Sequence, residues 1–107
     1  MAWIYLVIAG IFEIVWAMGL KASNGFTRLW PSVITLVGMV ISFYFLAQAS
    51  RTLPIGTAYA IWTGIGAVGA VIFGMILFNE PRDLIRLLFV GLILAGIIGL
   101  RVTAPPG

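Results

Sequence analysis

A single glutamate, Glu13, lies in the middle of an apolar run that extends from Ala2 to about Leu20. A run of this length suits a helix that crosses a bilayer. Its nine Leu, Ile, Val and Phe residues contribute about −3 to −5 kcal/mol to the free energy of insertion. The glutamate opposes insertion by about 2.5 to 3.5 kcal/mol. Such a costly residue usually marks an ion or proton pathway. We therefore interpret Glu13 as a site for a proton or a cation; the structural alternative is one interhelical hydrogen bond.

Aromatic and hydroxyl side chains accompany this acid at helical spacing. Trp16 follows Glu13 by three residues and shares its helix face. Tyr59 and Trp62 lie on one stripe of a later apolar run, and Ser42 lies near the middle of another. A lone deep tryptophan is more often packing than a site, but aromatic faces attract cations. Two deep tryptophans with a buried carboxylate favour a box for an organic cation.

The sequence supplies no positive partner for Glu13 within the apolar runs, because its six Lys and Arg residues lie near segment ends or in turns. The partner must then come from outside, as a proton or a cationic ligand. A carboxyl that holds either one, but not both well, meets the thermodynamic requirement of proton-coupled antiport. If two copies of Glu13 face each other in a dimer, they titrate as a pair.

Composition limits the classes of protein that remain. Of 107 residues, 63% are hydrophobic and 8% are charged, and a soluble fold of this size cannot bury so much apolar surface. The absence of cysteine and histidine excludes disulfides, thiolate metal sites and serine–histidine hydrolysis. We therefore expect an integral membrane protein that is not an enzyme, holds no cofactor or metal, and binds no nucleic acid.

Four apolar segments predict an all-α membrane protein, with one four-helix transmembrane domain over residues 1–107. The predicted helices cover residues 2–20, 31–49, 57–78 and 84–102, and residues 104–107 form a frayed tail. Continuous apolar runs do not fit the alternating pattern of a membrane barrel. The connections are short, so neighbouring helices are expected to run antiparallel.

Two glycines of the third segment, Gly64 and Gly66, belong to a letter match to the dinucleotide motif G-x-G-x-x-G. The match lies inside an apolar helix and follows no strand, so the dinucleotide interpretation fails. Glycine weakens a helix interior, and we predict that these two form a hinge.

Small residues in the fourth segment predict a contact between subunits. Gly91, Ala95 and Gly99 recur at intervals of four, with Gly96 beside them. Such spacing lets helices approach closely in lipid, although small residues are also common in membrane helices. Four helices enclose little volume, and a homodimer is the economical way to complete a solute pathway.

Basic residues at the segment ends give only a small orientation bias. One face carries two of them and the other carries four, which leans toward a cytoplasmic location for the first and third connections. A bias this small is compatible with insertion in both directions.

Two long motifs resemble a known family. The ranges Phe12–Lys21, FEIVWAMGLK, and Leu53–Ala70, LPIGTAYAIWTGIGAVGA, together with the four short spans, resemble the small multidrug resistance family of bacterial membrane transporters. The resemblance covers nearly the whole chain. Tryptophan three residues after the glutamate resembles the guanidinium-exporter branch, whereas the quaternary-ammonium branch typically has a small residue there.

The resemblance implies an antiparallel homodimer of dual topology in the bacterial inner membrane, with alternating access and guanidinium export in exchange for protons. It implies that two Glu13 side chains share a central site and bind guanidinium and proton in turn. The other pocket residues that it implies are Trp16, Ser42, Tyr59 and Trp62. Ser42 and Trp62 would hydrogen-bond the carboxylate and orient it. The third-helix glycines would mark a bend, and the fourth helix would dimerise.

Three alternatives stay open. The nearest is a broad exporter of quaternary ammonium compounds and other hydrophobic cations on the same fold. The second is a proton-binding membrane subunit without transport, such as a member of a rotor ring. The third is an interaction subunit that serves as half of a heterodimer, which the complete set of site residues in one chain disfavours.

Overall fold

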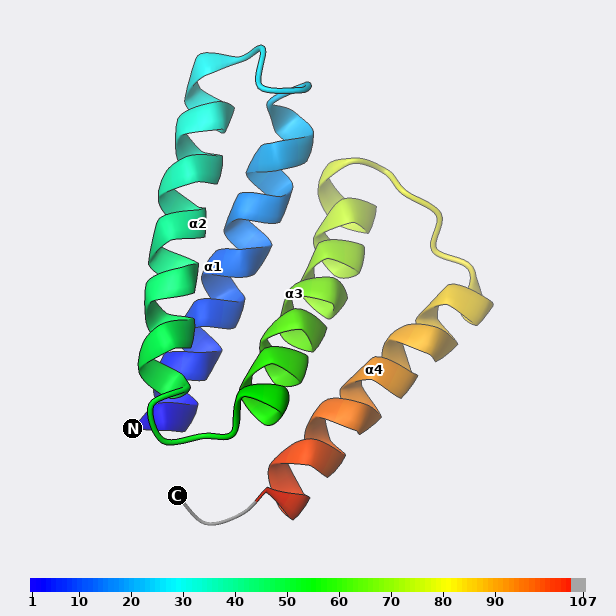
Figure 1. Ribbon diagram of the computed structural model, residues 1–107. Coiled ribbons are helices and arrows are strands. Elements are labelled where there is room, and N and C mark those ends of the chain that lie inside the picture. The colour runs from blue at the N-terminus through cyan, green and yellow to red at the C-terminus, as the bar shows by residue number, and fades with distance from the viewer. Residues whose placement is uncertain (105–107) are drawn as a thin grey trace.

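The computed structural model describes residues 1–104, which form four α-helices joined by short connections (Figure 1). The helices are α1 (Ala2–Ala22), α2 (Leu29–Ala49), α3 (Ile55–Leu77) and α4 (Leu84–Thr103). Each is long and apolar enough to cross a membrane, so the prediction of an all-α protein with four such helices is confirmed. Most of the tail predicted at residues 104–107 lies outside the described residues.

The helix ends differ slightly from the predicted ranges. α2 begins at Leu29, two residues before the predicted start at Pro31. Proline is accepted there because the first N–H groups of a helix have no partner within the helix. The turn before α2 uses left-handed backbone at Asn24, Gly25 and Phe26, with φ of 50°, 71° and 66°. Glycine adopts this conformation without strain, and asparagine tolerates it.

α1 is the central helix of the fold, since it packs against both α2 and α3 (Figure 1). The backbones of α2 and α3 approach each other closely at few points. The core includes Leu6 and Ala9 of α1, with Ala58, Ile61 and Trp62 of α3. α1 and α3 run in the same direction because α2 lies between them in the chain (Figure 1). They come close at glycines: an added Cβ at Gly10 or Gly69 would strike an isoleucine of the facing helix.

α4 lies to one side of the other helices (Figure 1). Among α1, α2 and α3, its backbone comes close to α3 alone. Its isoleucines Ile93 and Ile97 cover Gly64. Near its C-terminal end the guanidinium carbon of Arg101 lies 4.3 Å from the centre of the Trp3 ring, a cation–π contact. Val90 is the only α4 residue that is buried. The remaining apolar surface of α4 is of the kind that faces lipid or another helix.

Candidate functional site

Glu13 lies in the middle of α1 and faces the backbone of α3. An added Cβ at Gly66 would collide with the Glu13 carboxyl group, so this carboxyl occupies the space that any larger residue would fill. Its Oε1 atom is buried and has no hydrogen-bond partner among residues 1–104. A buried polar atom without a partner costs free energy in a membrane interior. The site is therefore suited to a partner from outside residues 1–104.

Ser42 and Trp62 form a hydrogen-bonded link among three helices, about one turn from Glu13. The Ser42 hydroxyl donates to the Ala9 carbonyl of α1 at 2.6 Å, and the Trp62 indole N–H donates to Ser42 Oγ at 2.9 Å. Ser42 is fully buried and Trp62 is 6% exposed. Neither bonds to Glu13 in this structure, so direct orientation of the carboxylate by this pair stays a prediction.

The Tyr59 ring packs against the Trp62 ring, with ring centres 5.5 Å apart. Its own side chain is 55% exposed on the protomer. Phe43 packs edge-on against the other part of Trp62, with ring centres 5.6 Å apart. Phe43 was not predicted as a site residue; its position next to Ser42 in an apolar helix was the available signal. The structure thus brings Ser42, Tyr59 and Trp62 together and adds Phe43.

Trp16 lies apart from this aromatic group. Its backbone and Cβ pack against Gly38 of α2, where an added Cβ would lie 3.2 Å from the Trp16 Cβ. Its indole Nε1 is buried and has no hydrogen-bond partner within the described residues. Two unpartnered buried polar atoms, a carboxylate oxygen and an indole N–H, therefore lie one helical turn apart on α1.

The predicted hinge and dimer residues have different surroundings. α3 is continuous through Gly64 and Gly66, and both glycines are used for close contacts, so the hinge stays a prediction. The small residues of α4 that were predicted to dimerise are Gly91, Ala95, Gly96 and Gly99. All four are exposed on the protomer, and the three glycines have open space where a Cβ would be.

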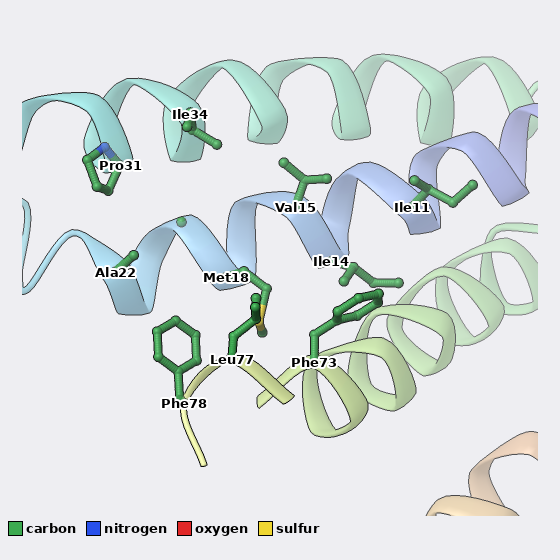
Figure 2. A pocket seen from close by; sticks show the side chains of 11 residues that line it. Ile11, Ile14, Val15, Met18, Ala22, Pro31, Ile34, Phe73, Leu77 and Phe78 are labelled. Atoms are coloured by element: carbon green, nitrogen blue, oxygen red, sulfur yellow. The ribbon is translucent and has the colours of Figure 1, made fainter. Parts of the chain in front are cut away.

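An apolar groove of about 590 Å³ lies beside α1, between α2 and the C-terminal end of α3 (Figure 2). Figure 2 shows Ile14, Met18 and Phe73 among the side chains that line it. None of its lining residues is charged, and Glu13 does not line it. This groove was not predicted, and its walls offer no charged group to a cation. Among residues 1–104 no group of three acidic side chains is arranged for a metal ion.

Comparisons with known proteins identify the family of this chain. A family model described as "Small Multidrug Resistance protein" matches residues 1–93. A protein of Yersinia pseudotuberculosis named "Guanidinium exporter" is 61% identical over 104 residues, which cover 97% of this chain and all of that protein. Proteins of the same name from Citrobacter freundii and Klebsiella oxytoca are each 59% identical over 103 residues, 96% of this chain and 98% of theirs. With its four apolar helices, the chain is a multi-pass membrane protein that belongs to the small multidrug resistance family.

Proposed function

We propose that this protein exports guanidinium across the bacterial inner membrane in exchange for protons. The observation that carries the proposal is the buried, unpartnered carboxylate oxygen of Glu13 in the middle of a membrane helix. The names of relatives about 60% identical over nearly their whole length support the choice of substrate.

The chemistry of guanidinium fits a carboxylate in this setting. Guanidinium is planar, and its paired N–H groups match the two oxygens of a carboxylate in bidentate fashion. Aromatic faces such as those of Trp16, Tyr59 and Trp62 add attraction for a flat cation. The Ser42–Trp62 hydrogen bond supports this role by fixing the indole ring beside the site. A quaternary ammonium ion has no N–H groups and would gain nothing from the bidentate geometry.

Exchange follows from competition for one group. In a low-dielectric site Glu13 binds either a proton or guanidinium, because the two neutralise the same charge. Alternating access then carries each to the opposite side, with α3 bending at Gly64 and Gly66. Flux of guanidinium in one direction requires flux of protons in the other.

The transporting unit in this proposal is a homodimer of oppositely oriented protomers with two Glu13 side chains in one site. The exposed ring of Tyr59 and the open glycines of α4 support an association that covers them. Small residues on a helix allow close packing in lipid, where apolar exposure alone gives no drive to associate.

Purified protein in liposomes tests the proposal by radiolabelled guanidinium uptake under an imposed proton gradient, compared with tetraethylammonium. We expect guanidinium to move and tetraethylammonium to move poorly. Glu13→Gln should insert and dimerise normally but lose coupled flux, and Glu13→Asp should keep part of it. Proton-driven guanidinium flux in Glu13→Gln contradicts the mechanism. Transport of tetraethylammonium without guanidinium would point to the broad cation exporters, and absence of transport to a non-transporting subunit.

A further inference from the structure

The Glu80 carboxylate packs against α3, the helix against which the Glu13 carboxylate also packs. An added Cβ at Gly74 would collide with the Glu80 carboxyl, as one at Gly66 would with Glu13. The Glu80 backbone N–H donates to the Gly74 carbonyl at 3.2 Å, which fixes this loop residue over the end of α3. The two glycines are about 12 Å apart at 1.5 Å per residue. Both acids are therefore held against α3, one in mid-membrane and one at its end.

A cavity of about 240 Å³ is lined by Glu80 and by residues that follow Glu13 on α1 and Gly66 on α3. Ala17 of α1 and Ala70 of α3 line it, together with Lys21 and Glu80. Ala17 is one turn beyond Glu13 on α1, and Ala70 is one turn beyond Gly66 on α3. One water occupies about 30 Å³ in the liquid, so this space accommodates a small cation with part of its hydration.

The charged side chains near this cavity leave the Glu80 carboxylate available to a cationic ligand. Arg82, its near neighbour in the chain, donates instead to the Met75 carbonyl at 2.8 Å. Lys21 lines the same cavity but is exposed at the end of α1. No ion pair to Glu80 forms among residues 1–104. A long lysine side chain can move into water at little cost, which makes room for another cation beside Glu80.

We propose that this cavity is the outer mouth of a path along the α1–α3 interface, and that Glu80 binds guanidinium before it reaches Glu13. The inference rests on the proposed function and adds a second, shallower cation site to it. If the protomers are oppositely oriented, the same sequence places one such acidic mouth on each side of the membrane. Substrate on either side then meets a carboxylate first.

The test compares Glu80→Gln with Asp83→Asn, which removes the same charge from the same connection but does not line the cavity. Initial guanidinium flux is measured against concentration at low ionic strength. We expect KM to rise about two- to five-fold in Glu80→Gln, the range of a half-exposed ion pair, with the maximal rate unchanged. Asp83→Asn should match wild type, and high salt should reduce the difference by screening. Equal KM for the two variants at low salt overturns the proposal.

A charge-restoring experiment excludes a purely structural effect of the substitution. The chain has no cysteine, so Glu80→Cys carries one thiol that can be labelled with an anionic sulfonatoethyl or a cationic trimethylammonium-ethyl methanethiosulfonate. The anionic label should lower KM relative to the cationic label in the same variant. Identical KM after both labels contradicts a charge role for position 80.

The two proposals fail in different ways. If wild-type protein moves no guanidinium, both the proposed function and the proposed Glu80 site are refuted. If wild type transports and Glu13→Gln does not, but position 80 is insensitive to charge, only the proposed Glu80 site is refuted.

Discussion

Replacing Gly66 by alanine tests whether the carboxyl of Glu13 must lie against bare backbone. The added Cβ would meet Glu13 Cγ at 2.8 Å, where ordinary contacts begin at 3.4 Å, and the carboxyl atoms would lie closer still. The side chain must therefore turn away from α3. Turning it breaks the alignment of its oxygens with a planar cation, and the loss of one charge-assisted hydrogen bond costs about 1.5–3 kcal/mol. That cost is about a ten- to hundredfold loss of affinity.

Helix stability should move in the opposite direction. Alanine is a better helix former than glycine by about 0.8–1.0 kcal/mol, so Gly66→Ala should fold and insert. Two control variants separate displacement of the acid from general repacking. Gly56→Ala, in the same helix, meets no atom within 4 Å, and Gly69→Ala collides with Ile14 rather than with the acid.

The assay is guanidinium flux against concentration in proteoliposomes. We expect KM to rise at least about tenfold in Gly66→Ala, to stay at the wild-type value in Gly56→Ala, and to change less in Gly69→Ala. Wild-type KM and rate in Gly66→Ala would refute the reasoning, since the acid would then function from another position.

Two further predictions concern stability. Trp62→Phe keeps a ring but removes the donor to Ser42, so the free energy of unfolding in detergent should fall by about 0.5–1.5 kcal/mol. Trp16→Phe removes an indole N–H without a partner among the described residues, so it should lower the free energy of unfolding by less. Equal losses in the two variants would argue against the hydrogen bond. Arg101→Gln removes the guanidinium above the Trp3 ring and should destabilise by about 0.5–1 kcal/mol. A double-mutant cycle with Trp3→Leu measures this coupling, and a coupling near zero would exclude the contact as a stabilising one.

The sequence predicted the four helices well because each signal is local. A continuous apolar run of about 20 residues is sufficient for a spanning helix. The start of α2 was placed two residues late, at Pro31, whereas the helix begins directly after Arg28. Such boundary errors reflect competing start signals within one turn.

Contacts between helices were harder to predict, because they depend on the register of one helix against another. Ala9 and Gly10 lie four and three residues before Glu13 on the same face of α1, and residues this small leave room for either a ligand or a neighbouring side chain. In the structure the Ala9 carbonyl accepts the Ser42 hydroxyl, and Ile65 fills the space beside Gly10. Ala17, four residues after Glu13 on the same face, lines the cavity beside Lys21 and Glu80. A small residue in a sequence thus indicates close approach, but not whether a ligand or another side chain makes it.

Gly66 shows why the proposed hinge and the proposed site belong together. The Glu13 carboxyl lies directly against this glycine, so any bend of α3 there changes the surface on which the acid rests. A screw movement of α3 by one residue, about 100° of rotation with 1.5 Å of rise, would bring a side chain where the glycine now is and push the carboxyl away. Movement of the helix and repositioning of the charge are then one event. A carboxyl walled by side chains on every side could be insulated from such a movement, whereas one placed on glycine cannot.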